Sequence, residues 1–154
     1  MLAELIASWS RLNLPENCEI VFLVVENDTV RRADVPAFVH TSGGDFDLCY
    51  ALEREHGIPH ARNRAVQIAI ERRADVLLFI DDDETADPGW AKNLVQAFRA
   101  SDASLFGGPV MPVPPGDEPL NAWQQTVFEG VTSRYARMAR KSERLVNQRK
   151  SNSL

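Results

Sequence analysis

Three consecutive aspartates, Asp81, Asp82 and Asp83, directly follow the apolar run VLLFI at residues 76–80. The run predicts a buried strand, and the alternation along a strand would send Asp81 and Asp83 to one side and Asp82 to the other. Carboxylates this close repel one another unless a cation lies among them. Mg²⁺ prefers one or two carboxylates together with phosphate oxygens and water. The cluster therefore suggests a metal-bridged diphosphate. A solvated acidic loop is the alternative.

A second polar group lies about twenty residues earlier, in the segment HARNRA at residues 60–65. This segment opens a helix predicted over about 60–73. Arg62 lies one turn before the apolar positions of that helix, at its positive end, where a guanidinium can pair with the phosphates of a nucleotide. A salt bridge to a nearby acid is the alternative for Arg62. Arg64 projects differently and is expected to be exposed to solvent.

A third group, Glu26-Asn27-Asp28, ends the apolar run EIVFLVV at residues 19–25. Such an unbroken run rich in branched residues is typical of a strand that is buried on both faces. Ligands of parallel sheets bind beyond the carboxyl ends of the strands. If this strand and 76–80 are parallel, Glu26 and Asp28 lie at the same edge of the sheet as the three aspartates.

The elements that position these groups follow from hydrophobic patterning. Helices are predicted over 2–12, over about 60–73 with Ala65, Val66, Ala69 and Ile70 on one face, and from Asp87, with Asp87 as N-cap and Pro88 in the first turn. Strands are predicted over 19–25, 37–41, 76–80 and 104–113. Helices that alternate with two-sided apolar strands predict the α/β class, with a mainly parallel sheet and flanking helices.

Length and composition indicate one ordinary domain with one core. The chain has 154 residues, of which 44% are hydrophobic and 25% charged. No apolar run approaches the roughly 18–20 residues of a membrane span, and the start of the sequence does not resemble a secretory signal. Cys18 and Cys49 have no CxxC spacing, so reduced thiols and a cytoplasmic location are expected.

The charge is distributed unevenly. Residues 131–154 hold seven of the 17 basic residues and one of the 22 acidic residues, which leaves ten basic and 21 acidic residues in 1–130. An acidic body argues against nucleic-acid binding, since it would release no phosphate counterions. The basic tail has two interpretations. It is a solvated helix, or it makes a peripheral contact with an anionic membrane surface at the inner face.

Four segments together resemble the GT-A fold of inverting family 2 glycosyltransferases, in particular the branch that builds bacterial exopolysaccharide repeat units. In order these are VFLVVEND, GIPHARNRAV, LLFIDDDETADPGW and FGGPV. The similarity covers roughly residues 2–115. It implies a partial nucleotide-sugar-binding domain over 1–119, and it leaves 120–154 as a basic helical or disordered tail.

The resemblance also implies roles for individual residues. The family's DxD motif falls on the three aspartates: Asp83 would bind the Mg²⁺ or Mn²⁺ that bridges the sugar diphosphate, Asp82 would lie near the ribose, and Asp81 would support the site. Arg62 would contact the nucleotide. Glu26 would read the base edge, with Asp28 beside it among the substrate-binding residues. The implied donor is a nucleotide-diphosphate sugar such as a UDP-sugar, and the implied acceptor is a glycan or a lipid-linked glycan.

The sequence departs from the family at two places. Family members open with a strand that lies in the middle of the sheet, and here the chain begins with the helix that normally follows it. After residue 119 the family carries a pair of acids, one of which is the general base, and here Glu129 and Glu143 are the only acids. We therefore assign no catalytic residue and expect a chain truncated at both ends, with weak or no transfer activity. We also expect strands 19–25 and 76–80 to close up and pair directly.

Two other functions fit parts of the sequence. A non-catalytic accessory module would retain only a metal–nucleotide site. A receiver-like or phosphoryl-transfer domain also places aspartates at strand ends, but it needs a lysine on a separate strand. The only lysine before residue 141 is Lys92, inside a predicted helix, which counts against that function.

Overall fold

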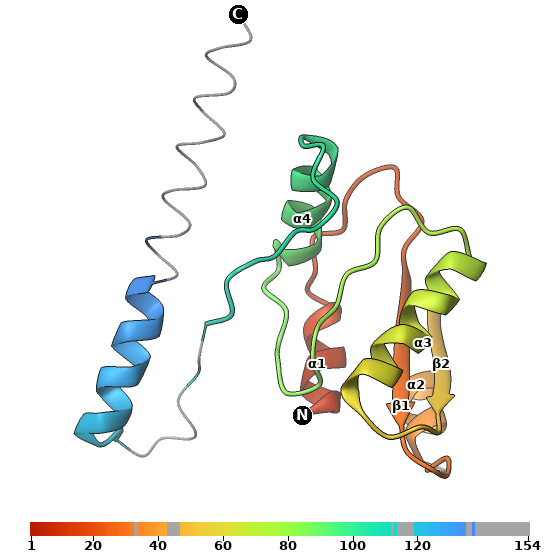
Figure 1. Ribbon diagram of the computed structural model, residues 1–154, viewed down its shortest axis with the longest axis horizontal. Coiled ribbons are helices and arrows are strands. Elements are labelled where there is room, and N and C mark those ends of the chain that lie inside the picture. Colours follow the sequence, from red (N-terminus) through yellow and green to blue (C-terminus); the bar gives the residue numbers. More distant parts are fainter. Residues whose placement is uncertain (33, 43–46, 112, 114–118, 135–136, 138–154) are drawn as a thin grey trace, which may run out of the picture. The chain divides into compact units, whose positions relative to one another are not determined.

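The structure is a computed structural model that describes residues 1–32, 34–42, 47–111, 113, 119–134 and 137. The chain consists of two compact units, Met1–Phe106 and Gly107–Leu154. The first unit contains, in chain order, α1 (Leu2–Trp9), β1 (Val21–Asn27), α2 (Asp34–Ser42), β2 (Asp47–Glu53), α3 (Ile58–Glu71) and α4 (Trp90–Arg99), as Figure 1 shows.

The sheet consists of β1 and β2, which pair in parallel from Val21 opposite Asp47 to Asn27 opposite Glu53. Helix α3 follows β2 and runs back along the sheet (Figure 1). The predicted α/β class, with a parallel sheet flanked by helices, is confirmed. β2 itself was not predicted, because DLCYALE mixes charged and apolar residues and lacks the apolar run expected of a buried strand.

Two of the predicted strands have other structures. Residues 37–41 lie within α2, where Val39 is fully buried. A short apolar run cannot be distinguished from a buried helical segment by its periodicity, so the prediction of a strand here was wrong. The described part of 104–113 is not a strand either.

The expected pairing of 19–25 with 76–80 is also wrong. Within the described residues, 76–80 belongs to no ladder, and β1 pairs with β2 alone. Instead, a cavity of about 1300 Å³ is lined by β1 along one side and by residues 74–82 along the other.

α1 is shorter than predicted, α4 begins later than predicted, and the inward face of α3 differs in detail. α1 ends at Trp9, and α4 begins at Trp90 instead of Asp87. Asp87 caps a turn instead of the helix, because its Oδ1 accepts the N–H of Gly89 at 2.8 Å. On α3, Ile70 was predicted to face the core but is 71% exposed.

The core lies where α1 covers β1. Trp9 stacks on Phe22 with the ring centroids 4.6 Å apart. The hydroxyl of the fully buried Ser8 donates to the carbonyl of Leu5 at 2.6 Å and accepts the backbone N–H of Ala86 at 3.0 Å. The loop that follows the three aspartates is thereby attached to α1.

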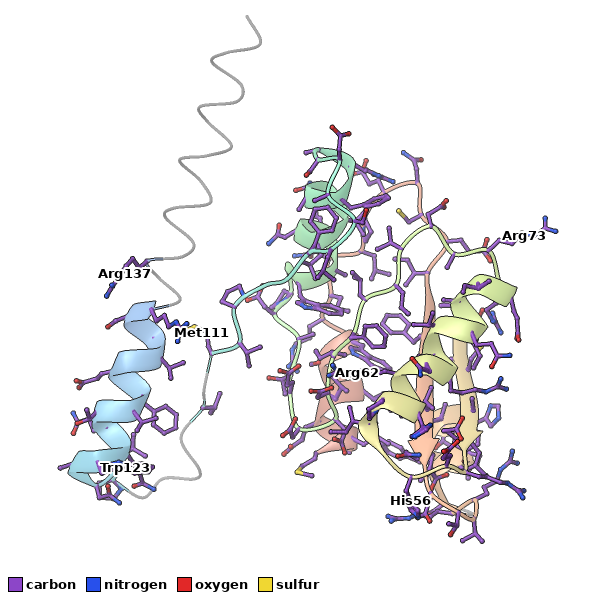
Figure 2. The ribbon with its side chains drawn as sticks, viewed as in Figure 1. His56, Arg62, Arg73, Met111, Trp123 and Arg137 are labelled. Carbon is purple, nitrogen blue, oxygen red and sulfur yellow. The ribbon has the colours of Figure 1, made fainter. Side chains whose placement is uncertain are left out.

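In the second unit, residues 122–134 are helical, and Trp123 is 74% exposed (Figure 2). Of the basic segment 131–154, only 131–134 and 137 are described, so the prediction for the tail falls mostly outside the described residues. No helix in the described part of the chain is long and apolar enough to span a membrane.

Candidate functional site

Asn27 fixes the position of the start of α3 relative to the carboxyl ends of both strands. Its Nδ2 donates to the carbonyls of Glu53 at 3.1 Å and Glu55 at 2.7 Å, and its Oδ1 accepts the N–H of Gly57 at 2.8 Å. Gly57 has φ = +132°, which L side chains rarely adopt, so glycine is required where the chain enters α3. The positive end of α3 is therefore held at the edge where β1 ends.

Glu26 lies at this edge with its side chain only 9% exposed. Its carboxylate accepts hydrogen bonds from the hydroxyl of Tyr50 and from the backbone N–H of Arg32, the latter at 3.3 Å. Burial, and then the carboxylate of Glu26, raises the pKa of Tyr50 above its usual 10.0. The guanidinium of Arg31 lies 5.1 Å from the centre of the Tyr50 ring. Both carboxylate oxygens of Glu26 thus already accept a hydrogen bond from the protein.

Asp28 is also held by its neighbours. Its carboxylate accepts the N–H of Thr29 at 2.7 Å and the Nε–H of Arg32 at 3.3 Å. Burial raises the pKa of Asp28, but these hydrogen bonds and the charge of Arg32 outweigh it, so the pKa lies below its usual 3.8. Asp28 is therefore anionic at neutral pH.

Arg62 and Asp81 form an ion pair at the same edge. Nη2 of Arg62, the residue labelled in Figure 2, lies 3.1 Å from Oδ1 and 3.4 Å from Oδ2 of Asp81. The guanidinium lies 5.7 Å from the centre of the Phe79 ring. Both side chains are more than half exposed, at 52% and 60%. Ion pairs this exposed contribute only about 0–1 kcal/mol, so a phosphate could displace the carboxylate from Arg62 at little cost.

The other two aspartates lie in a turn. The N–H of Glu84 donates to the carbonyl of Asp81 at 3.1 Å, and Oε2 of Glu84 accepts the N–H of Asp81 at 3.2 Å. Asp82 and Asp83 occupy the two central positions of this turn and are exposed. The predicted alternation of the three side chains along a strand was wrong, because the chain turns at this point instead of continuing extended.

Within the described residues, no three acidic, histidine or cysteine side chains converge in a manner that could hold a metal ion. The carboxylates of the turn are nonetheless the hard oxygen donors that Mg²⁺ prefers. A cation here would take one or two ligands from this turn and the remainder from a diphosphate and water.

The 1300 Å³ cavity brings most of the predicted residues together. Its lining includes Glu26, Asp28, Arg62, Asp81 and Asp82 at the mouth where β1 ends. Asp83 does not line the cavity and lies farther along the turn. Sequence reasoning missed Asn27, Arg32 and Tyr50. Asn27 did stand out between two acids, whereas nothing in the sequence marked Tyr50.

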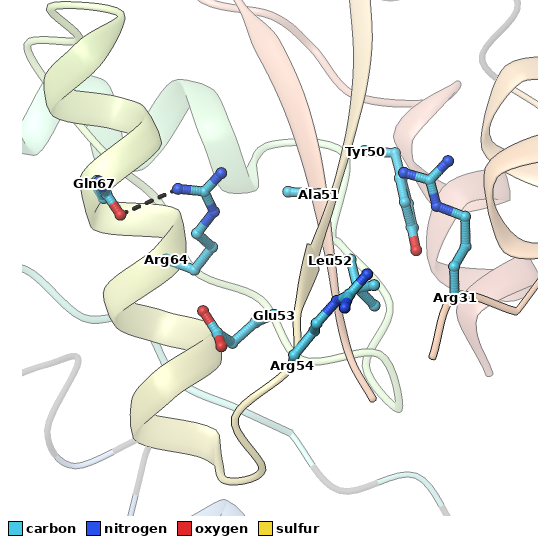
Figure 3. Close-up of a pocket in the computed structure, with 8 residues that line it drawn as sticks. All are labelled: Arg31, Tyr50, Ala51, Leu52, Glu53, Arg54, Arg64 and Gln67. Carbon is cyan, nitrogen blue, oxygen red and sulfur yellow. Dashed lines mark hydrogen bonds between the residues drawn. The ribbon is translucent and has the colours of Figure 1, made fainter. Parts of the chain in front are cut away.

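A second, shallower pocket of about 600 Å³ lies against β2 and contains Arg31, Tyr50, Arg54 and Arg64 (Figure 3). Arg64 donates to the side chain of Gln67 at 3.1 Å. It is partly buried, whereas Arg62 is exposed, which reverses the exposures expected for the two arginines. Cys18 and Cys49 form no disulfide with each other.

Comparisons with known proteins agree with the family resemblance. The family model described as glycosyl transferase family 2 matches residues 1–151, which extends beyond the expected 2–115. The chain is 30% identical over 109 residues to the succinoglycan biosynthesis protein ExoM of Rhizobium meliloti, covering 71% of this chain and 34% of that protein. It is 33% identical over 72 residues to a glucosyl-dolichyl phosphate glucuronosyltransferase of Haloferax volcanii, covering 45% of this chain and 22% of that protein. The chain thus spans about a third or less of the length of these relatives. No solved structure matches significantly.

Proposed function

The chain belongs to glycosyltransferase family 2, and we propose that it binds the nucleotide-diphosphate part of a sugar donor at the edge where β1, α3 and the Asp81–Asp83 turn meet. The reaction of the site would be transfer of the sugar to a carbohydrate acceptor, free or lipid-linked. The names of the two relatives, a succinoglycan biosynthesis protein and a glucosyl-dolichyl phosphate glucuronosyltransferase, are consistent with acceptors of this class.

The observation that carries the proposal is the ion pair of Arg62 with Asp81 at the cavity mouth. An arginine at the positive end of a helix is a favourable partner for a diphosphate. Asp81 holds the guanidinium at the mouth while no anion is bound. When a diphosphate arrives, Arg62 would exchange one exposed anionic partner for another that carries more charge.

Each of the acidic residues would contact a different part of the donor. Asp83, whose carboxylate is exposed, would hold Mg²⁺ or Mn²⁺ against the diphosphate, and Asp82 would lie near the ribose. When bound, the metal would stabilise the charge of the leaving diphosphate. Glu26 would reach a nucleobase only by giving up the Tyr50 or the Arg32 contact, whereas Asp28 is a fixed negative charge beside it.

The second candidate function is a non-catalytic nucleotide-binding module. This function is favoured because Glu129 and Glu143 are the only acidic residues in 120–154, the segment in which the family's general base is expected. We also propose a cytoplasmic location, with the basic segment 131–154 in contact with an anionic membrane surface.

Calorimetric titration of UDP, with and without Mn²⁺, tests the proposed site. We expect binding that strengthens at least about 10-fold with Mn²⁺, because the metal would bridge carboxylate and diphosphate. Asp83→Asn should remove the effect of the metal. Asp102→Asn, an exposed acid outside the site, should leave it unchanged. Equal heats with and without Mn²⁺ would contradict the proposal.

A further inference from the structure

The strand β2 has an open edge. β1 pairs with one of its edges, and within the described ranges no strand pairs with the other. Because the N–H of Asp28 donates to the carbonyl of Glu53, Glu53 and Ala51 direct their backbone groups toward β1. The alternate residues Tyr50 and Leu52 direct theirs the opposite way, where they make no backbone hydrogen bond to any described residue. The open edge therefore presents backbone donors and acceptors at the spacing of a strand.

The pocket of about 600 Å³ extends along this open edge. Arg64 and Gln67 of α3 lie on one side of β2 in Figure 3. Arg31 lies on the other side, where its guanidinium is 5.1 Å from the centre of the Tyr50 ring. Arg54 directly follows the strand. A strand added at the open edge would therefore have guanidinium groups beside both of its faces.

The three arginines of this pocket have no acidic partner among the described residues. Arg31, Arg54 and Arg64 form no ion pair there, although residues 1–130 hold 21 acidic residues against ten basic ones. The one acid that lines the pocket is Glu53, whose carboxylate accepts the N–H of Glu55 at 2.8 Å. The pocket is therefore basic within an acidic body, and its charge favours an anionic ligand.

The open edge and the arginines together specify the class of ligand. N–H and C=O groups that repeat along a strand pair regularly with an extended polypeptide. Carboxylates of that polypeptide would form charge-assisted hydrogen bonds with the guanidinium groups. An acidic glycan would supply the charge, but it lacks the regular alternation of donors and acceptors, so a polypeptide fits better.

Two occupants supplied by this chain fit less well. Two copies paired edge to edge through β2 would bring identical arginines together, and like charges on facing strands are destabilising. Residues 131–154 hold seven basic residues and one acid, so this segment would also be repelled. The charges therefore favour a different, acidic polypeptide.

We propose that the open edge of β2 binds an extended acidic segment of a partner polypeptide, which adds to the sheet as a strand. The backbone of the segment pairs with Tyr50 and Leu52. Adjacent side chains of a strand point to opposite faces, so two consecutive acids would meet Arg64 on one face and Arg31 on the other. The proposal does not depend on the nucleotide site, and Arg54→Glu should leave the binding of UDP unchanged.

The test uses a synthetic peptide with capped ends and the sequence threonine, valine, glutamate, glutamate, valine, threonine. One control replaces both glutamates by glutamine. The other carries N-methyl groups on all four central residues, so that neither edge of the peptide can donate a hydrogen bond. In an NMR titration we expect saturable binding of the first peptide and a loss of about 10-fold or more for each control. Amide exchange at Tyr50 and Leu52 should slow at least about 3-fold at saturation.

Charge reversal on the protein tests the arginines. Arg54→Glu and Arg64→Glu should each weaken binding of the glutamate peptide about 10-fold, and the double variant should prefer a peptide with lysine in place of both glutamates. Arg11→Glu, at an exposed position outside the pocket, should leave binding unchanged. Circular dichroism establishes that each variant is folded. If the double variant does not fold, the two control peptides decide with the unsubstituted protein.

Three results would each overturn the proposal. The first is absence of saturable binding, or equal binding of the glutamate peptide and either control. The second is slow amide exchange at Tyr50 and Leu52 without peptide in a dimer, which would show that a second copy covers the edge. The third is binding of an oligomer of galacturonic acid where the peptide does not bind, which would assign the arginines to an acidic glycan.

Discussion

The guanidinium of Arg62 lies 3.1 Å from the carboxylate of Asp81, although 19 positions separate the two residues in the chain. The contact joins the start of α3 to the turn that follows 76–80. It places a cation and an exposed acidic turn at the same mouth of the 1300 Å³ cavity.

Arg62→Gln should weaken the binding of UDP in the presence of Mn²⁺ by about 10- to 100-fold, because a hydrogen bond to a charged group contributes about 1.5–3 kcal/mol. The free energy of unfolding should change by less than about 1 kcal/mol, since the ion pair is exposed. Calorimetry and urea denaturation measure the two effects. Arg11→Gln, at an exposed position on the loop after α1, is the matched control. Unchanged affinity in Arg62→Gln would rule out Arg62 as a phosphate contact.

Asn27→Ala should destabilise the protein by about 1–3 kcal/mol, because it leaves the carbonyl of Glu53 and the N–H of Gly57 without their side-chain partner. Hydrogen exchange at Gly57 should accelerate, and UDP binding should weaken as the start of α3 loosens. Asn13→Ala, at an exposed position, is the control and should change neither the hydrogen exchange at Gly57 nor the binding of UDP. Exchange at Gly57 that is as slow as in the unsubstituted protein would show that α3 is positioned by other contacts.

Ser8→Ala should lower the free energy of unfolding by about 1–3 kcal/mol, since the buried N–H of Ala86 would lose its acceptor. Ser10→Ala removes a similar hydroxyl whose hydrogen bond, to the carbonyl of Ala7, is exposed, and should have an effect below about 0.5 kcal/mol. Urea denaturation measures the free energy of unfolding of both variants. Equal effects would mean that the loop after Asp83 is not held by Ser8.

Tyr50 should ionise only above its usual pKa of 10.0, because burial and the neighbouring carboxylate of Glu26 disfavour the tyrosinate. A pKa raised by folding favours the protonated native state, so this contribution to stability is complete below pH 10 and is lost as the pH rises through the folded value. The tyrosinate absorbance of the protein minus that of Tyr50→Phe isolates the titration. Glu26→Gln should shift it to lower pH, and a titration at or below pH 10 in the unsubstituted protein would contradict the contact.

The chain by itself should transfer sugar far more slowly than about 1 s⁻¹, the lower end of the usual range for enzymes, when it is incubated with UDP- or GDP-sugars and glycan acceptors. A positioned general base contributes about 10²–10⁴-fold, and neither Glu129 nor Glu143 has a context that identifies it as one. Product analysis by mass spectrometry measures the rate. Turnover near 1 s⁻¹ that Glu129→Gln abolishes would instead identify the base.

The sequence by itself determined the α/β class, the positions of β1, α1 and α3 to within a few residues, the start of α4, and the placing of Glu26 at the same edge as Asp81. These follow from local properties. A long branched apolar run favours a buried strand, helical periodicity favours an amphipathic helix, and parallel elements bring their carboxyl ends together.

Only the tertiary structure decided which partners the site residues take and where the sheet ends. Glu26 contacts Tyr50 on a strand that the sequence did not mark. Among the described residues, 76–80 pairs with no strand, although its apolar pattern is as strong as that of β1. The physical reason is that apolar patterning determines which residues leave water, whereas the choice of hydrogen-bond partner depends on which backbone edge lies within about 5 Å. That distance is set here by α1, which packs on β1, and by the Asn27 contacts, which position α3.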